Sequence, residues 1–421
     1  MMFDLKKRKT DVKTEFVAAL TTFFTLSYIL AINPKFLSDA GMDYGAVFVA
    51  TALSAGIATL LAGVLANRPF ALAAGMGLNS YFAYSVVMKM GFRWEEALAA
   101  VFASNALMLL LVLSRINLAR AIPEGFRHAL IAGLGLFLVF IGMQNAHFIE
   151  TSPSTLVSIG DLTRPAALIS VLGFFITSAL VARKVKGGMF LGMLATTIIA
   201  MAAGFAPLPQ KLFEMPPDIS KVALHVDYGS LLHPILVPVI WSLFIITFLD
   251  VLGTATALGM RAGRKPESVD REMGANAAGG MVGANLGATS IVTYLESAAG
   301  IEAGGRTGLT AVFIALLFFL SIFFFPLVKA IPVEAAAPVI IIVGEMMLLE
   351  IRFIDMRDYS DAIPALMAVA TIPFTFSISN GIGVGSIAYI FLKWVTGKRK
   401  DVHPAMYVIA LLSALEFARV F

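Results

Sequence analysis

Long runs of apolar residues, separated by short polar or charged stretches, follow one another along almost the whole chain. A run of about 20 apolar residues has the length of a helix that crosses a bilayer. The pattern predicts an all-α polytopic membrane protein with about 14 transmembrane segments. The runs lie at 14–33, 44–66, 69–88, 97–113, 128–146, 165–182, 189–206, 233–260, 273–301, 307–328, 332–350, 361–378, 380–396 and 404–420. The last run fits either a full span or an interfacial helix.

Two runs are interrupted by residues that suit an ordinary lipid-exposed helix poorly. The run 69–88 carries two glycines, an asparagine and a serine at its middle. The run 273–301 is long enough for two short elements divided near Gly287, and the β-branched, hydroxyl-bearing residues 287–293 favour an extended piece. Broken backbone at membrane depth is tolerated only where protein or a wet cavity satisfies its polar groups. We therefore expect short extended pieces in spans 3 and 10.

Two short motifs recur at similar spacing in the two halves of the chain. Arg120-Ala121-Ile122-Pro123 returns 209 positions later as Lys329-Ala330-Ile331-Pro332. At nearly the same offset, Gly75-Met76-Gly77-Leu78-Asn79-Ser80 aligns with Asn285-Leu286-Gly287-Ala288-Thr289-Ser290. If the spans alternate, the two basic motifs face opposite sides of the membrane, so the halves are inverted. Inverted halves with interrupted spans at matching places indicate a secondary transporter with a site near the midplane.

The composition supports the membrane assignment and excludes several classes of protein. Hydrophobic residues make up 59% of the 421 residues and charged residues 14%, against roughly 45–50% and 25% in soluble proteins. The mean hydropathy of +0.87 agrees. Because there is no cysteine, disulfides, thiolate metal sites and cysteine nucleophiles are excluded.

The charged loops predict how the chain is oriented in the membrane. With alternating spans, the basic loops fall on one side, whereas the loop 147–163 between its neighbours has no lysine or arginine. The positive-inside rule therefore predicts a multi-pass protein of the cell membrane with a cytoplasmic N-terminus. These loops also account for the net charge of +4, so no nucleic-acid partner is expected. The basic residues are Lys6–Lys9, Arg115, Arg120, Arg127, Arg183, Lys184, Lys186, Arg261, Arg264, Lys265 and Lys398–Lys400.

Few acidic residues lie inside the apolar runs, and an ionised side chain in hydrocarbon is a functional candidate because it is costly to place there. Asp250 and Glu296 each stand alone in the middle of a run beside glycine and hydroxyl residues. The alternative is a structural acid that is hydrogen-bonded to a neighbour such as Thr254 or Ser297. For Glu345, near the end of its run, the structural interpretation is preferred, since it could reach the interface or pair with a loop cation.

Two carboxylates, the Asn79 amide and hydroxyls such as those of Thr254 and Ser297, in an apolar cavity, indicate one kind of ligand better than others. A metal ion would need more converging oxygens, and an anion would be repelled. The five histidines are scattered near span ends without ligand spacing, so we expect no metal or cofactor. A flat, neutral heterocycle with several N–H donors fits, because carboxylates accept paired N–H bonds and Tyr294 or Phe82 could stack on its ring. A carboxylic acid in such a site can also carry a proton.

Several longer motifs resemble one family over nearly the whole chain. They resemble the nucleobase permeases of the nucleobase–cation symporter-2 superfamily, in particular the AzgA-like branch that transports hypoxanthine, adenine and guanine. The motifs are Thr14-Glu15-Phe16 through Tyr28 to Asn33-Pro34, Gly75 through Tyr84, Thr293-Tyr294-Leu295-Glu296-Ser297-Ala298-Ala299-Gly300-Ile301, and Gly304-Gly305-Arg306-Thr307-Gly308-Leu309-Thr310.

The resemblance implies fourteen spans in two inverted sets of seven. It implies a core domain at 14–113 and 233–328 and a gate domain at 120–206 and 329–421, often in a dimer. The apolar run at the C-terminus is additional to this pattern. A base would be held between spans 3, 8 and 10.

On the matching positions, Asp250 takes the acid of span 8, Glu296 the acid of span 10, and Asn79 the polar contact of span 3. Thr254 stands where relatives use a polar residue one turn beyond Asp250. Many relatives read Phe-Asp-Thr-x-Gly-Thr around that acid, whereas this chain has Val251 in place of the first hydroxyl. The substitution leaves base preference open.

These observations together predict an importer of purine bases that is driven by proton symport and works by an elevator movement of core against gate. In this hypothesis Glu296 grips the edge of the base and Asp250 couples protonation to occupancy. The alternatives are a uracil or xanthine permease, an anion transporter of the same fold, and an intramembrane enzyme such as an aspartyl protease. Two acids argue against an anion site, and neither acid has the paired acidic motif that such a protease requires.

Overall fold

The computed structural model describes residues 3–114, 122–262 and 269–417. Arg115, Arg120, Arg264 and Lys265, which contribute to the predicted orientation and repeat, lie outside the described residues.

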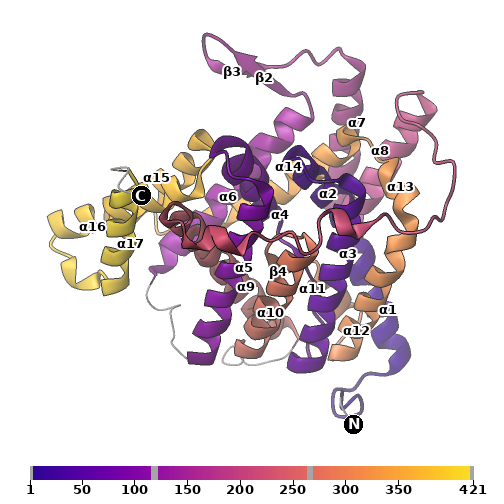
Figure 1. Cartoon of the computed structure of the whole chain (residues 1–421), viewed down its shortest axis with the longest axis horizontal. Coiled ribbons are helices and arrows are strands. Elements are labelled where there is room, and N and C mark those ends of the chain that lie inside the picture. The colour runs from indigo at the N-terminus through magenta and orange to yellow at the C-terminus, as the bar shows by residue number, and fades with distance from the viewer. Residues whose placement is uncertain (1–2, 115–121, 263–268, 418–421) are drawn as a thin grey trace.

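The chain folds into helices joined mainly by short connections, as the apolar runs predict (Figure 1). The helices are α1 (Val12–Leu26), α2 (Ile29–Asp39), α3 (Tyr44–Leu61), α4 (Met76–Ser80), α5 (Trp94–Ser114), α6 (Glu124–Asn145), α7 (Pro165–Ala182), α8 (Gly188–Ala202), α9 (Val237–Arg261), α10 (Asp270–Leu286), α11 (Ser297–Glu302), α12 (Gly308–Ser321), α13 (Phe325–Lys329), α14 (Val333–Leu348), α15 (Tyr359–Thr375), α16 (Ile378–Val395) and α17 (Pro404–Phe417). Two π-helical segments, Ala62–Ala66 and Tyr81–Lys89, extend α3 and α4, and a 3₁₀ segment, Leu349–Phe353, extends α14.

Within the described part of the chain, eight helical segments are long and apolar enough to cross a membrane. They are Val12–Asp39, Tyr44–Ala66, Trp94–Ser114, Glu124–Asn145, Pro165–Ala182, Pro234–Arg261, Gly308–Lys329 and Ile378–Val395. Two of the other predicted runs, 69–88 and 273–301, are broken, and the remaining four form helices of 14 to 17 residues. The multi-pass helical membrane protein is thus confirmed, and the count of fourteen spans stays a prediction.

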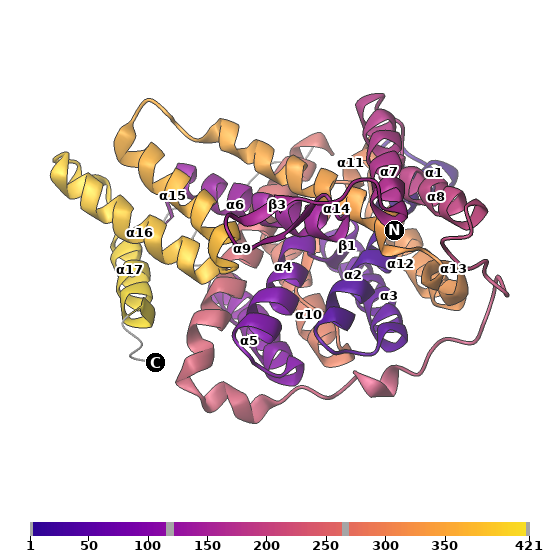
Figure 2. The same cartoon turned by 90° about the horizontal axis from the view of Figure 1, so that it is seen from above.

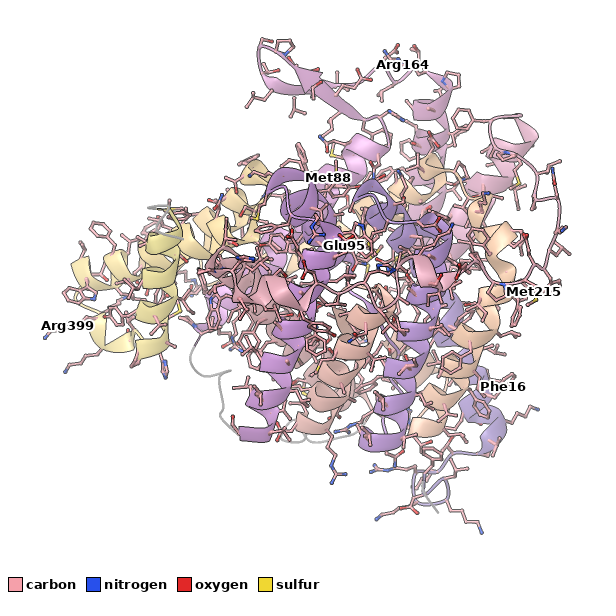
Figure 3. All side chains as sticks on the ribbon, viewed as in Figure 1. Phe16, Met88, Glu95, Arg164, Met215 and Arg399 are labelled. Atoms are coloured by element: carbon pink, nitrogen blue, oxygen red, sulfur yellow. The ribbon has the colours of Figure 1, made fainter. Side chains whose placement is uncertain are left out.

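Large apolar side chains project outward from several of these helices. Phe16 on α1, labelled in Figure 3, is 42% exposed, and Phe175 on α7 and Phe391 on α16 are more exposed still. Apolar side chains exposed along apolar helices suit contact with lipid.

The two broken runs meet at the centre of the molecule (Figure 1). Leu72–Ala74 (β1) and Ile291–Thr293 (β4) form an antiparallel pair in which Leu72 lies opposite Thr293 and Ala74 opposite Ile291. Each strand is followed by a short helix, α4 after β1 and α11 after β4. The extended pieces that the sequence predicts in these runs are confirmed, and the backbone of each satisfies the polar groups of the other.

A glycine ends the helix before the second strand. Gly287 is the C-cap of α10 and has a φ of +89°, in the left-handed region that favours glycine. A Cβ at this position would also lie 2.6 Å from a side-chain carbon of Val222. The predicted division near Gly287 is therefore where the chain turns from helix to strand.

A β-hairpin in the loop between α6 and α7 was not predicted. Ile149–Ser152 (β2) pairs with Leu156–Ile159 (β3) in the loop that carries no lysine or arginine between 147 and 163. Arg164, just beyond it, forms an ion pair with Glu150 of β2 at 3.2 Å (Figure 3). The N-terminus and this hairpin lie at opposite ends of the molecule in Figure 1.

The second half of the chain packs α14 and α15 against α6, while α16 and α17 form one edge of the molecule (Figure 2). The backbones of α6 and α14 approach closely, since a Cβ on Gly135 would lie 2.6 Å from the carbonyl oxygen of Gly344. The described part of α17 has 14 residues. At about 1.5 Å per residue it spans about 21 Å, less than the roughly 30 Å hydrocarbon core.

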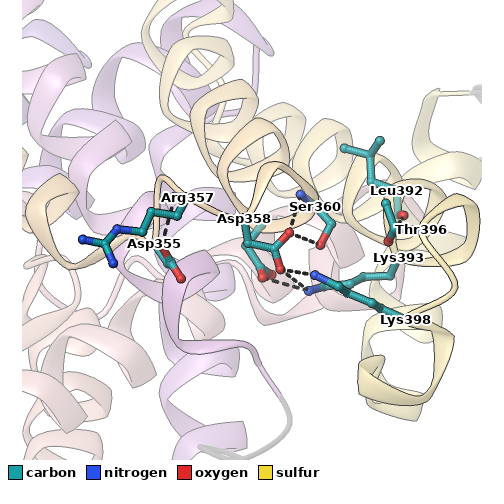
Figure 4. A network of polar contacts seen from close by, with 9 residues as sticks. Asp355, Arg357, Asp358, Ser360, Leu392, Lys393, Thr396 and Lys398 are labelled. Atoms are coloured by element: carbon teal, nitrogen blue, oxygen red, sulfur yellow. Dashed lines mark hydrogen bonds and ion pairs between the residues drawn. The ribbon is translucent and has the colours of Figure 1, made fainter.

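A network of ion pairs ties α15 to the end of α16 (Figure 4). The Lys393 ammonium, whose side chain is 5% exposed, lies 2.8 Å from an Asp361 carboxylate oxygen and 3.8 Å from one of Asp358. Lys398 Nζ lies 2.6 Å from Asp358. Burial of Lys393 is thus compensated by two acids. Glu345, in contrast, is exposed on α14, and no cation pairs with it among the described residues.

Candidate functional site

A cavity of about 190 Å³ lies beside the β1–β4 pair. Its wall is formed by both broken segments, by the middle of α9, and by facing parts of α6 and α14. The described residues that line it are Tyr28, Gly75, Met76, Gly77, Leu78, Ile131, Leu134, Asp250, Gly253, Thr254, Ala257, Val292, Thr293, Tyr294, Leu295, Glu296, Val343, Met346, Met347 and Glu350.

Asp250 and Glu296 both line this cavity, although they come from different elements. Asp250 lies in the middle of α9, which is continuous, and Glu296 is the residue that precedes α11. One turn from Asp250, Gly253 leaves open space, because a Cβ there would meet no atom within 4 Å. The structure thus brings the two predicted acids to one site, and their roles remain predictions.

Two tyrosines fix the geometry around Glu296. The Tyr28 hydroxyl donates a hydrogen bond of 2.5 Å to Glu296 Oε1, and the Tyr28 side chain is fully buried. The Tyr294 hydroxyl donates to the carbonyl oxygen of Ala74 at 2.6 Å, which holds its ring beside β1. A hydrogen bond to a charged group contributes about 1.5–3 kcal/mol, so Tyr28 orients the carboxylate. Tyr28 was not among the predicted site residues.

The hydroxyls next to the two acids do not bind their carboxylates. Thr254 lines the cavity, but its Oγ1 donates to the backbone oxygen of Asp250 at 2.7 Å. Ser297 Oγ accepts from the backbone N–H of Ala71 at 3.0 Å. The alternative in which these neighbours hold structural acids is therefore not what the structure shows.

Asn79, Phe82 and Ser297 were expected at the site but are not among the described lining residues. Asn79 is fully buried and accepts a hydrogen bond from Thr289 through its side-chain oxygen. Phe82 is 1% exposed and packs in the apolar core. The first turn of α4, rather than Asn79, faces the cavity because the Asn79 amide is bonded toward the loop before β4.

The aligned motifs of the two halves of the chain meet in the hydrogen bond between Thr289 and Asn79. Asn79 belongs to the first motif and Thr289 to the second. Gly75 N–H also donates to the carbonyl oxygen of Ser290 at 3.0 Å. These contacts hold the two broken segments together next to the cavity.

The opposite wall of the cavity was missed by the sequence interpretation. It is apolar, with Ile131 and Leu134 of α6 facing Val343, Met346 and Met347 of α14. No periodic pattern separates these residues from ordinary core residues of a membrane helix, so the sequence carries no signal for them.

A third acid, Glu350, also lines the cavity. It lies in the 3₁₀ segment at the end of α14, and its carboxylate oxygen is 2.6 Å from His128 Nδ1. In the sequence it reads as a charge at the boundary of a span. Only the fold brings it to the cavity.

The described lining residues include three carboxylates and no lysine, arginine or histidine. Such a site would repel an anion and suit a neutral ligand with hydrogen-bond donors. The volume lies below the roughly 300–1,000 Å³ of sites for drug-sized ligands, which matches a ligand of one or two small rings. Among the described residues, no group of three or more histidine, aspartate or glutamate side chains could hold a metal ion.

Comparison with protein families matches residues 13–384 to the family described as Permease family. A permease homologue from Methanocaldococcus jannaschii is 44% identical over 422 residues, covering 99% of this chain and 97% of that protein. The adenine permease AdeP of Escherichia coli is 36% identical, covering 99% and 95%. The guanine/hypoxanthine permease PbuO of Bacillus subtilis is 36% identical, covering 98% of each chain.

Solved structures of other transporters share the fold at low sequence identity. SLC26A9 superposes with a TM-score of 0.68 at 10% identity, covering 92% of this chain and 67% of that chain. The transmembrane domain of the cyanobacterial bicarbonate transporter BicA gives a TM-score of 0.66 at 14% identity, covering 88% and 97%. At this identity the likeness concerns the fold alone.

Proposed function

Since this chain belongs to the Permease family, we propose that it is a secondary transporter that imports purine nucleobases in symport with protons. The purine relatives named above support the substrate class. The observation that carries the proposal is the cavity itself, where Asp250 and Glu296 face one small space whose described wall has no basic side chain.

In this proposal Glu296 accepts N–H bonds from the edge of the base. The hydrogen bond from Tyr28 to one of its oxygens leaves the other oxygen for the ligand. The ring of Tyr294, which also lines the cavity, offers a surface for stacking. Together they recognise a flat ring with N–H donors rather than a sugar or phosphate.

Asp250 is proposed to carry the coupled proton. Its carboxyl group lines the same cavity, and no hydroxyl among the described residues is hydrogen-bonded to it, since Thr254 is bonded to the backbone. A carboxyl group that is protonated when the base is bound, and deprotonated when it is released, links the two gradients. Asn79 and Ser297 act in the proposal as supports of the broken segments, and Phe82 as core.

The transport movement is proposed to follow the elevator scheme, with the core (14–113 and 233–328) moving against the gate (120–206 and 329–421). The β1–β4 pair, each strand followed by a short helix, supports the two inverted sets of seven spans. The cytoplasmic N-terminus and a homodimer belong to the same proposal. The orientation rests on the positive charge of the loops, and the dimer rests on the resemblance of the sequence to the permease family.

The test is uptake of radiolabelled hypoxanthine by cells or proteoliposomes that contain the protein, with and without a protonophore. We expect concentrative uptake that the protonophore abolishes. Glu296→Gln should remove high-affinity uptake, and Asp250→Asn should stop accumulation, while both variants still reach the membrane. Unchanged uptake by Glu296→Gln would remove that residue from the site.

Competition by unlabelled bases distinguishes a purine permease from the nearest alternative, a uracil or xanthine permease. Unlabelled adenine and guanine should compete with hypoxanthine, whereas uracil and xanthine should compete weakly. Stronger competition by uracil or xanthine would assign the protein to the sister specificity and leave the transport proposal in place.

A further inference from the structure

The third acid of the cavity is connected to the surface through a histidine. Glu350 lines the cavity, and its Oε2 lies 2.6 Å from His128 Nδ1. The other ring nitrogen, Nε2, lies 3.9 Å from Glu124 Oε1. The side chains of Glu350 and His128 are 30% and 23% exposed, whereas that of Glu124 is 77% exposed. A line of titratable groups thus runs from the cavity wall to the exposed start of α6.

The surroundings of His128 contain few other charges among the described residues. Glu350 and Glu124 face its two nitrogens, and its ring packs on Phe353 with 5.1 Å between centroids. The Arg352 guanidinium lies over the other ring of that pair, 4.7 Å from the Phe353 centroid. The imidazole thus stands between two carboxylates, one near each ring nitrogen.

We propose that Glu350 and His128 form a proton relay that releases the coupled proton from the cavity to the predicted cytoplasmic side, an inference that rests on the proposed proton symport. Of the described residues, only Asp250, Glu296 and Glu350 supply acids to the cavity wall. Of these three, Glu350 alone is hydrogen-bonded to a histidine.

The relay is a series of three proton transfers, the first of which carries the coupled proton from Asp250 to Glu350 across the cavity that both residues line. The proton leaves the Glu350 carboxyl group and forms a bond to Nδ1 of neutral His128, which already carries a proton on Nε2. The imidazolium then loses its Nε2 proton to Glu124 or to water, since one water can bridge a separation of 3.9 Å. The starting tautomer is restored by exchange with water, which takes the Nδ1 proton and supplies one to Nε2, and Glu350 is left ionised for the next cycle.

Two assays, net uptake and exchange, distinguish a residue that relays the proton from a residue that binds the base. Net uptake driven by a pH gradient requires the carrier to release its proton, but exchange of labelled for unlabelled base at equal pH does not. In proteoliposomes with the full chain, Glu350→Gln should lower net hypoxanthine uptake at least tenfold and leave exchange within twofold of the unmodified protein. His128→Gln should do the same, and Glu350→Asp should restore part of net uptake.

Glu345→Gln is the matched control, because Glu345 lies on α14 and is exposed but does not line the cavity among the described residues. It should change neither assay. Loss of both net uptake and exchange in Glu350→Gln would make Glu350 a binding or structural residue, and retention of both would make it dispensable; either result overturns the relay. If the unmodified protein shows no proton-driven uptake, the proposed function fails together with the relay.

Discussion

At the residue scale, Tyr28 contacts the candidate site directly, through a hydrogen bond to the Glu296 carboxylate. It comes from the turn between α1 and α2, 268 positions from the Glu296 carboxylate that it contacts. Its ring is fully buried, so removing the hydroxyl alone keeps the packing. Replacing Tyr28 by phenylalanine therefore tests whether the hydroxyl orients Glu296, because the buried ring is kept.

We predict that Tyr28→Phe raises the KM for purine uptake by about tenfold to a hundredfold, with little change in protein abundance. A hydrogen bond to a charged group contributes about 1.5–3 kcal/mol, and every 1.4 kcal/mol is about tenfold in affinity. The measurement is concentration-dependent uptake at fixed pH. Tyr84→Phe is the control, because its hydroxyl bonds to Asp39, which does not line the cavity. An unchanged KM in Tyr28→Phe would contradict the orienting role.

Val251 stands where the family pattern that the sequence resembles has a hydroxyl, but it is not among the described residues that line the cavity. It is fully buried and absent from the described lining, whereas Thr254 lines the cavity. We therefore predict that Val251→Thr leaves the ratio of adenine to hypoxanthine uptake within twofold of the unmodified protein. Thr254→Val, the matched reverse change, should lower uptake. Competition uptake with both bases measures the ratio, and a shift with Val251→Thr would place residue 251 in the determination of base preference.

Sequence reasoning found the acids of the site but only some of their partners. Asp250 and Glu296 could be predicted because each is a lone charge inside an apolar run, which is costly without a purpose. Tyr28 lies in one of the family-like motifs, but the motif alone gives the tyrosine no role, and nothing local marks Glu350, an acid at the end of a span. Asn79 lies outside the described lining of the cavity, where its side-chain oxygen accepts from Thr289, and its contact with a ligand stays a prediction.

At the element scale, Glu15 explains two of the family-like motifs at once. Its buried carboxylate accepts from the backbone N–H groups of Arg306 at 3.0 Å and Thr310 at 3.1 Å, and from the Thr310 hydroxyl. It thereby caps the start of α12 from α1, and a negative charge at a helix N-terminus is stabilising.

We predict that Glu15→Gln destabilises the protein by about 1.5–3 kcal/mol, because a charged acceptor of several donors becomes a neutral amide. The melting temperature in detergent should fall. The control Glu302→Gln alters a side chain that is 66% exposed and pairs with Arg261 at 3.6 Å, and it should cost about 1 kcal/mol or less. Equal shifts for the two variants would refute the capping role.

The ion-pair network of α15 and α16 predicts a pH dependence. Hydrogen bonds from Lys398, and then from Ser360, lower the pKa of Asp358, the N-cap of α15 (Figure 4). A lowered pKa in the folded state means that Asp358 contributes stability above its unfolded pKa of about 3.9. That contribution is lost as the pH falls through the lower, folded value.

The stability difference between the unmodified protein and Asp358→Asn should accordingly be constant from pH 8 to pH 6 and shrink only as the pH falls below about 4. Thermal unfolding in detergent at several pH values measures it. Asp355→Asn is the control, since among the described residues Asp355 accepts only from the Arg357 backbone N–H, at 3.0 Å. A difference that grows on acidification would reverse the sign and contradict the assignment.

Helices and strands could be predicted where the residue types along a run match the backbone conformation that the run adopts. The broken runs followed from glycine, hydroxyl and β-branched residues at membrane depth, and Gly287 marks the break in both sequence and structure. The β2–β3 hairpin was missed because a polar loop of this length carries no periodic signal that distinguishes a hairpin from a coil. The run 189–206 extends beyond α8, which ends at Ala202, as helix ends are the least defined part of an apolar run.

At the scale of the whole molecule, the sequence led to the general architecture through composition and resemblance, but not to the contacts between its halves. Ser379 at the start of α16 lies within hydrogen-bond distance of two residues from the predicted core, Tyr81 at 3.2 Å and Ser242 of α9 at 2.8 Å. Lys89 also donates to the Thr375 carbonyl oxygen. No apolar pattern along one run could predict these polar contacts between distant runs.

The Ser242–Ser379 pair offers a direct test of movement between core and gate. The hydroxyl oxygens are 2.8 Å apart, and the chain has no cysteine of its own. We predict that S242C/S379C forms a disulfide on oxidation and that uptake then stops, because an elevator must separate these side chains. A disulfide holds two Cβ atoms about 3.8 Å apart, which fixes α16 to α9.

Reduction should restore uptake, and each single variant should transport with or without oxidant. The readouts are hypoxanthine uptake and disulfide formation. The disulfide is detected by electrophoresis, because it keeps the two fragments together after proteolytic cleavage between positions 242 and 379. Full uptake by the quantitatively cross-linked protein would mean that α9 and α16 move as one body. The boundary between moving parts would then lie elsewhere than between 233–328 and 329–421, because a covalent bond of this length leaves no room for a displacement of one helix past the other.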